Sequence, residues 1–213
     1  MKMKRIIVLL LIVCIAVIPA LFSFAACEKK EETGGGDSEN AEDAGPAAQS
    51  FLKEAATGDR DNYGGSVGYE FECVADITVS AVGRPLNGEM NNSHTIYIWE
   101  VSSQTLLAKA TVTPDSPLDA LAFKTAPLAN PIALKAGEKY RIVSSEENGG
   151  DKWYDIGTSP DDAPDLLPTA DGIITTPVFT GEGEWDSYPS NEYNPGGVKG
   201  YVGVTFYYVQ AAG

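Results

Sequence analysis

Five aromatic residues lie in stretches rich in Gly, Asp and Pro, and binding residues concentrate in such loops on rigid scaffolds. They are Trp153, Tyr154, Trp185, Tyr188 and Tyr193. Exposed aromatic faces stack on sugar rings, so this set predicts a ligand-binding surface built from loops. The alternative is that Trp153 and Trp185 close over the ends of the folded domain as buried rings, and the sequence leaves both interpretations open.

A group of aspartates surrounds the first of these aromatics. It comprises Asp151, Asp155, Asp161, Asp162 and Asp165. Carboxylates are hard oxygen ligands, and Ca²⁺ is the metal that they suit outside the cell. Their spacing lacks the order of an EF-hand loop, so a solvated acidic loop is the competing interpretation. Calcium is thus the one cofactor that the sequence suggests, and no other is expected.

Catalytic groups are sparse. The chain has a single His, at position 94, which leaves little room for a Ser or Cys nucleophile with a general base. No nucleophile-elbow motif accompanies it. Carboxylates are adjacent at 146–147 and close together at 182–184, but proximity in sequence does not predict the facing geometry of a glycosidase. We therefore expect no enzyme and no catalytic residue, and a structural role for His94.

The balance of charge excludes one class of partner. The chain has 213 residues, with 15 Lys and Arg against 30 Asp and Glu, and a formal net charge of −15. Such a chain repels nucleic-acid phosphates and anionic lipid headgroups. We therefore expect no nucleic-acid partner and no electrostatic attachment to a membrane.

The N-terminus has the organisation of a secretion signal. Residues 1–5 include basic side chains, residues 6–18 are apolar, and Ala25 and Ala26 precede Cys27. This arrangement is typical of a bacterial lipoprotein signal peptide, whose cysteine is lipidated at the cleavage site. Two or more acyl chains, palmitate among them, anchor a protein stably to a membrane. An ordinary signal peptide with a free Cys27 is the alternative.

The content of apolar residues divides the rest of the chain into a linker and a domain. Residues 28–50 contain no apolar residue larger than Ala, so nothing in them offsets the entropy of ordering. We expect a signal peptide at 1–26, a lipidated Cys27 with a flexible acidic linker at 27–56, and one domain at 57–213. The predicted location is extracytoplasmic, lipid-anchored on the outer face of a Gram-positive cell membrane, while a Gram-negative envelope stays open.

The elements that must carry these side chains are strands. Alternating apolar and polar residues at 69–79 predict a strand in which Cys73 is a buried small residue. Residues 95–101 and 106–112 predict a hairpin. Further strands are expected at 118–123, 132–134, 139–144, 172–178 and 200–209. No segment predicts a stable helix, so the expected fold is all-β, an antiparallel β-sandwich of jelly-roll or immunoglobulin-like type.

Ordered blocks of sequence also carry a resemblance. They read GYEF at 68–71, ITVSAVGR at 77–84, SHTI at 93–96, LAKATV at 107–112, PIALKAGEKY at 131–140 and SEENGGDKWYD at 145–155, with a β-rich end at 201–208. Over about 58–209 the chain resembles a bacterial secreted family of domains of unknown function. The resemblance implies an extracellular β-sandwich, and a non-catalytic surface module with a glycan as its ligand.

Together these observations predict a membrane-anchored surface lipoprotein whose β-sandwich is a binding module. Besides the membrane reached through the lipid on Cys27, the expected partner is an extracellular or cell-wall carbohydrate, bound by the loop aromatics. The alternative is a protein-interaction, adhesion or structural module without a glycan ligand, which uses a sheet face or a sheet edge.

Overall fold

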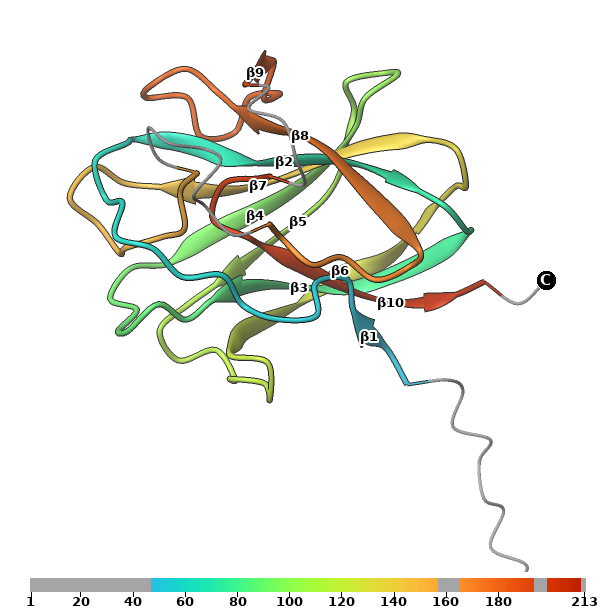
Figure 1. The fold of residues 1–213 in the computed structure, drawn as a ribbon, viewed down its shortest axis with the longest axis horizontal. Coiled ribbons are helices and arrows are strands. Elements are labelled where there is room, and N and C mark those ends of the chain that lie inside the picture. Colours follow the sequence, from blue (N-terminus) through green and yellow to red (C-terminus); the bar gives the residue numbers. More distant parts are fainter. Residues whose placement is uncertain (1–46, 157–164, 194–198, 212–213) are drawn as a thin grey trace, which may run out of the picture. The chain divides into compact units, whose positions relative to one another are not determined.

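The computed structural model describes residues 47–156, 165–193 and 199–211, and in these ranges the chain forms ten strands and no helix (Figure 1). The strands are β1 (Gln49–Ser50), β2 (Gly65–Cys73), β3 (Ile77–Pro85), β4 (His94–Glu100), β5 (Leu106–Val112), β6 (Phe123–Leu134), β7 (Lys139–Glu146), β8 (Gly172–Phe179), β9 (Asn191–Glu192) and β10 (Thr205–Gln210). The expected signal peptide, Cys27 and most of the expected linker lie outside the described residues. Across those same described ranges, no apolar helix of membrane-spanning length occurs.

The strands pair into two antiparallel sheets, which Figure 1 shows as two layers. One sheet has four strands in the order β1-β10-β3-β6, and the other has six in the order β5-β4-β7-β2-β8-β9. Neighbouring strands come from distant parts of the chain: Gly68 in β2 lies opposite Val143 in β7 and Val178 in β8. The predicted antiparallel β-sandwich is confirmed.

The apolar stripe at 69–79 is two strands rather than one. Residues 65–73 form β2 in the six-stranded sheet, and residues 77–85 form β3 in the four-stranded sheet. Between them the chain turns at residues 74–76, and Asp76 ties this turn to the one between β6 and β7: it accepts the backbone N–H of Ala136 at 2.9 Å and pairs with Lys135 at 2.7 Å. The alternation continues through the turn in sequence, but each half faces the core from a different sheet.

Two other expected strands differ from the structure in their extent. Residues 118–122 precede β6 and contain a turn instead of a strand, because Asp119 Oδ1 accepts the backbone N–H groups of Leu121 and Phe123 at 2.9 and 2.8 Å. The last strand begins at Thr205 instead of residue 200, since Val202 and Gly203 have φ angles of 61° and 69° in the left-handed region. The predicted hairpin is confirmed as β4 and β5.

An aromatic cluster fills the space between the sheets. Phe51, Phe71 and Phe206 lie with ring centroids 4.5 to 5.3 Å apart, and Tyr69 and Tyr140 pack against them. These side chains are all buried. Large aromatic side chains bury 150–250 Å² each, so this cluster supplies much of the hydrophobic stabilisation of the domain.

The folded domain begins earlier than the expected boundary at residue 57. Gln49 and Ser50 form β1 against β10, and Phe51 and Leu52 are completely buried in the core. Burial of a Phe or Leu side chain contributes about 1.5–3 kcal/mol, which is enough to order the segment that carries it. The expected linker at 27–56 therefore extends too far into the domain.

Candidate functional site

The structure separates the loop aromatics into exposed and buried rings. Trp185 and Tyr193 are 42% and 44% exposed, and Tyr188 is half-buried. Trp153 and Tyr154 are 2% and 1% exposed and belong to the core. Rings buried to this extent present no solvent-exposed face, so Trp153 and Tyr154 do not contribute to an exposed aromatic platform.

Tyr188 and Tyr193 lie apart from any hollow that Trp185 lines. Tyr188 packs edge-on against Trp99, with ring centroids 5.9 Å apart, and lies 5.1 Å from the guanidinium carbon of Arg141. Tyr193 donates its backbone N–H to the carbonyl of Pro177 at 3.1 Å. The structure therefore does not bring the three less buried aromatics together into one platform.

Trp185 is held in place from two sides. Its indole Nε1–H donates to the carbonyl of Glu146 at the end of β7, at 3.0 Å, and its own carbonyl accepts the hydroxyl of Ser66 in β2. The loop before it is fixed as well, because Gly183 donates its backbone N–H to the carbonyl of Gly64 at 2.9 Å. The ring is thus exposed to solvent but fixed in orientation.

A hollow lies on each side of Trp185. The first, of about 420 Å³, is lined by Gly64, Glu147, Asn148, Glu182, Gly183 and Trp185. The second, of about 270 Å³, is lined by Ser93, Thr95, Tyr97, Ser145, Glu147 and Trp185. Trp185 and Glu147 line both, so the indole and one carboxylate stand between two polar hollows. We call the two hollows and these linings the Trp185 surface.

The charge of the Trp185 surface is negative. Glu147 and Glu182 line it, and Glu184 and Asp186 flank Trp185 in the same exposed loop. Burial and the charge of Asp186 raise the pKa of Tyr97 at its floor, so that hydroxyl stays protonated at neutral pH. The surface can therefore present an apolar ring face together with hydroxyl, amide and carboxylate groups, and it repels anions.

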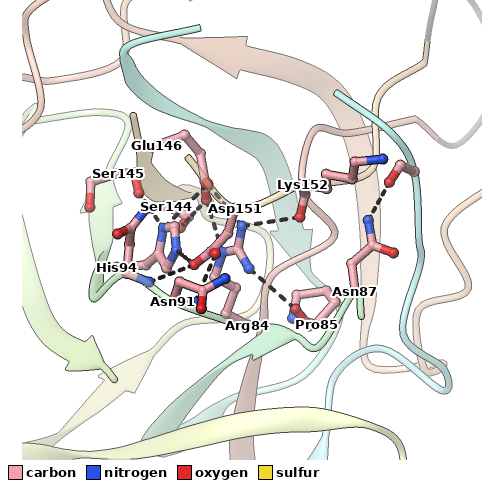
Figure 2. A network of polar contacts seen from close by, with 12 residues as sticks. Arg84, Pro85, Asn87, Asn91, His94, Ser144, Ser145, Glu146, Asp151 and Lys152 are labelled. Carbon is pink, nitrogen blue, oxygen red and sulfur yellow. Dashed lines mark hydrogen bonds and ion pairs between the residues drawn. The ribbon is translucent and has the colours of Figure 1, made fainter. Parts of the chain in front are cut away.

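The strands beside the Trp185 surface carry a buried polar network, shown in Figure 2. Arg84 of β3 donates to both carboxylate oxygens of Glu146, Nε–H at 3.0 Å and Nη2–H at 2.9 Å. Ser144 donates its hydroxyl to the same carboxylate at 2.7 Å. Arg84 and Glu146 are both buried, and they join the four-stranded sheet to the six-stranded sheet.

His94 and Asp151 extend this network to the neighbouring loops (Figure 2). His94 Nδ1 lies 2.8 Å from the carbonyl of Ser145 and 3.2 Å from Glu146 Oε2, and Nε2 lies 2.9 Å from Asp151 Oδ2. All three partners only accept hydrogen bonds, so both ring nitrogens carry protons and His94 is an imidazolium. Two buried cations then face two buried carboxylates, and the network is neutral.

The pKa values of these groups follow from their pairing. Burial lowers the pKa of His94, but its hydrogen bond to Glu146 and the charge of that carboxylate outweigh burial and Arg84, and the pKa is raised. Burial raises the pKa of Glu146, but His94 and Arg84 bring it below its usual range. Asp151 behaves alike, because His94 and the backbone N–H groups of Asn91 and Asn92 lower its pKa against the effect of burial.

The network positions the Trp185 surface. Glu146 provides the carbonyl that holds the indole, and it precedes Glu147, which lines both hollows. Asp151 binds the backbone N–H groups of Asn91 and Asn92 at 2.8 and 2.9 Å, ahead of Ser93 in the second hollow. The rigid floor of the surface thus depends on charges that are buried beside it.

His94 does not have the geometry of a catalytic base. Both of its nitrogens donate to acceptors, so neither has a lone pair for a hydroxyl nucleophile. The nearby Ser144 hydroxyl donates to Glu146 instead of His94. Glu146 is buried while Glu147 is exposed, so the two adjacent carboxylates do not face a common substrate position.

The structure distributes the predicted metal ligands over separate partners. Asp151 belongs to the buried network, Asp155 pairs with Arg60 at 3.0 Å, and Asp165 pairs with Lys199 at 3.0 Å. Asp161 and Asp162 lie outside the described residues. Among the residues that the structure describes, no group of three or more His, Cys, Asp or Glu side chains is placed to hold a metal ion.

Sequence reasoning did not single out Arg84 or Asn148. A signal for Arg84 was present: it stands two residues after Val82 in an apolar alternation, so it shares the inward face of β3. A charged residue at an inward position predicts a buried partner of opposite charge. Nothing in the sequence identified Glu146 as that partner, because the register between distant strands decides it.

The comparison with protein families adds an assignment. The profile of a domain of unknown function, DUF4082, matches residues 53–159, which is half of the 213-residue chain. The chain belongs to the DUF4082 family. A search of curated proteins finds no match. The DUF4082 match spans β2 to β7 and contains the whole buried network, whereas Trp185 and the strands β8, β9 and β10 follow it in the chain.

Proposed function

We propose that this DUF4082 protein is a bacterial surface lipoprotein whose β-sandwich binds extracellular or cell-wall polysaccharide without catalysis. The observation that carries the proposal is Trp185, an exposed indole fixed by hydrogen bonds to Glu146 and Ser66 between two polar hollows. A sugar ring has apolar C–H faces and a rim of hydroxyls. The indole face and the surrounding amide, hydroxyl and carboxylate groups complement both parts.

Preorganisation supports this function. Ordering a flexible side chain on binding costs about 0.5–1.5 kcal/mol, and the indole hydrogen bond to Glu146 has already ordered the Trp185 ring, while Ser66 fixes its backbone. The acidic lining favours neutral polysaccharide over teichoic or uronic acid polymers, because Glu147 and Glu182 repel anions. The ligand class that fits best is a neutral glycan chain lying across Trp185.

The anchor belongs to the same proposal. Lipidation of Cys27 places the domain outside the cell membrane, on the outer face of a Gram-positive cell, and an acidic tether ending near residue 48 separates the two. Metabolic labelling with an alkyne analogue of palmitate tests this, with Cys27→Ser as the unlabelled control. Labelling of the Cys27→Ser protein contradicts lipidation at this position.

Binding to a panel of immobilised neutral and anionic polysaccharides tests the ligand, with Ca²⁺ and with chelator. We expect saturable binding to a neutral glycan, and a loss of more than about tenfold in affinity in Trp185→Ala. Tyr193→Ala is the matched control, because Tyr193 is equally exposed but lines neither hollow. If calcium takes part in binding, chelator lowers the affinity. If it does not, the affinity is the same with Ca²⁺ and with chelator.

Equal losses in both variants, or silence of the folded protein across the panel, contradict the proposal. A protein partner is then the second candidate. Leu118 and Leu121 favour it, because they are 53% and 39% exposed in the connection from β5, the edge strand of the six-stranded sheet. Leu121→Ser combined with cross-linking on intact cells tests that alternative.

A further inference from the structure

A second cavity, separate from the Trp185 surface, is walled by aromatic rings. Its volume is about 110 Å³, and its lining is Arg60, Tyr63, Val67, Trp153, Phe179 and Tyr201. The rings meet edge to face: Tyr63 with Phe179 at 88°, Phe179 with Tyr201 at 84°, and Trp153 with Tyr201 at 89°. We call this cavity the aromatic cage. Its walls hold one another in position, so it is formed in advance of any ligand.

Arg60 completes the circle of rings. Its guanidinium carbon lies 4.9 Å from the ring of Trp153 and 5.8 Å from that of Tyr63, the two ends of the chain of rings. It is fixed there by Asp155, 3.0 Å from Nη1, and by Asn62, 3.1 Å from Nε. The Arg60 side chain is 32% exposed, so the cage has a polar and partly open side.

Two buried polar atoms, one on a residue that lines the cage and one on the carboxylate that holds Arg60, have no partner among the described residues. One is Trp153 Nε1, a donor, and the other is Asp155 Oδ1, an acceptor. Buried polar groups are nearly always hydrogen-bonded, so the unpaired indole N–H of a lining residue points to an acceptor that enters the cage. A hydroxyl both donates and accepts, and it satisfies either atom.

We propose that the aromatic cage receives the hydroxyl-bearing edge of a single neutral sugar unit, such as the end or a branch of a glycan, because its volume of about 110 Å³ holds part of a sugar ring. Its C–H groups contact the ring edges that line the cage, and its hydroxyls bond the Trp153 indole N–H and Arg60 at the partly open side. This rests on the proposed glycan-binding function and adds a second subsite to it. The two subsites are adjacent in the chain, because Tyr63 lines the cage and Gly64 lines the first hollow beside Trp185.

The electrostatics of the cage favour a neutral ligand over an ion. Aromatic cages bind quaternary ammonium groups through their ring faces, but here Arg60 already occupies the position over Trp153 and Tyr63. Its charge is balanced by Asp155, so a second cation meets a repelling guanidinium. An anion meets the carboxylate of Asp155 in turn. A hydroxyl-bearing neutral ring avoids both penalties.

Free monosaccharides are the probes for the test: glucose, galactose, mannose, xylose and N-acetylglucosamine, titrated calorimetrically into the full chain. The NMR signal of the Trp153 indole N–H, assigned with Trp153→Phe, reports the cage directly. Arg60→Ala removes a donor from a partly exposed position, and Val67→Leu fills the cavity from β2. Lys152→Ala is the matched control, because it removes an exposed positive charge that does not line the cage.

We expect one monosaccharide to bind and to shift the Trp153 signal, with affinity reduced about tenfold or more in Arg60→Ala and Val67→Leu and unchanged in Lys152→Ala. Trp185→Ala keeps this binding while losing the polysaccharide. If the Trp185 surface binds polysaccharide but no monosaccharide shifts the Trp153 signal, the cage proposal is overturned and the proposed function stands.

Two further results also overturn the cage proposal. One is a gain of tetramethylammonium binding in Arg60→Ala without any sugar binding, which makes the cage a cation site. The other is monosaccharide binding that neither cage variant weakens, which places the sugar elsewhere. If Val67→Leu does not fold, the Arg60→Ala titration and the Trp153 signal decide alone. Absence of binding to every saccharide, in wild type and in variants, overturns both proposals together.

Discussion

Replacement of Glu146 by Gln tests the buried network most sharply. The substitution keeps the shape of the side chain but converts one carboxylate oxygen into an amide NH₂. In the native structure one oxygen accepts Arg84 Nε–H and the Ser144 hydroxyl, and the other accepts Arg84 Nη2–H and faces His94. Whichever oxygen becomes the NH₂ group, a donor then faces donors in a buried space.

The magnitude follows from the burial of the charges. Glu146 and Arg84 are 0% and 1% exposed, and without the Glu146 charge two buried cations remain with one buried carboxylate, that of Asp151, which pairs with His94. Removing one partner of a buried ion pair costs about 3–5 kcal/mol of unfolding free energy. For a domain of this size that corresponds to a melting temperature lower by about 6–20 °C.

The assay is equilibrium unfolding in urea at pH 7, followed by circular dichroism and extrapolated linearly to water. Glu147→Gln is the matched control, because Glu147 is the next residue and is exposed. Its unfolding free energy should stay within about 0.5 kcal/mol of wild type. A Glu146→Gln protein that is less than about 1 kcal/mol below its control would refute the reasoning, because it would mean that the pair is solvated or easily replaced.

Four further predictions concern single groups. First, the pKa of His94 is raised in the folded state, so protonated His94 stabilises the fold fully below its unfolded pKa of about 6.5, and this contribution is lost as pH rises through the folded pKa. The unfolding free energy should therefore be lower at pH 8 than at pH 6. His94→Asn should remove this difference. Second, burial and the charges of two nearby aspartates raise the pKa of the Cys73 thiol to about 12, so iodoacetamide at pH 8 should modify Cys73 only in denaturant. The mass of the peptide that contains Cys73 measures the modification. Modification of the native protein would contradict the burial of the thiol. Third, a Cβ on Gly68 lies 2.0 Å from a carbonyl oxygen of β7, so Gly68→Ala should lower stability by more than about 3 kcal/mol in urea unfolding, while Gly64→Ala, whose nearest neighbour is 3.8 Å away, should fold normally. Fourth, Phe51→Ala should lower the unfolding free energy by about 3–5 kcal/mol in the same assay. A change near zero would mean that the segment around Phe51 belongs to the linker and not to the folded domain.

The fold was predictable to the extent that it is written in local alternation. Residues 95–101 and 106–112 have the period of a half-buried strand, and they form the β4 and β5 hairpin. The stripe at 69–79 has the same period throughout, yet it divides between two sheets at a turn held by Asp76. A period of two reports which residues face the core, and it does not report where the chain changes sheets.

The candidate site was predictable only in part. The aromatics of the Gly- and Asp-rich loops were identifiable, but the two neighbours Trp153 and Tyr154 are core, while Trp185 is exposed. Their sequence surroundings are similar, so composition could not separate them. What separates them is packing: Trp153 and Tyr154 pack in the aromatic core, while Trp185 is pinned at the rim by Glu146 and Ser66.

The sequence by itself determined the class of the fold, the net charge of −15, the presence of a single His and the burial of Cys73, because these depend on residue types and on contacts between near neighbours. Only the tertiary structure decided that Arg84 of β3 meets Glu146 of β7, that His94 contacts both Glu146 and Asp151, and that Arg60 closes a cage of four rings. The physical reason is that a buried charge or ring is stabilised by partners brought from distant strands, and strand register, which local sequence does not encode, chooses those partners.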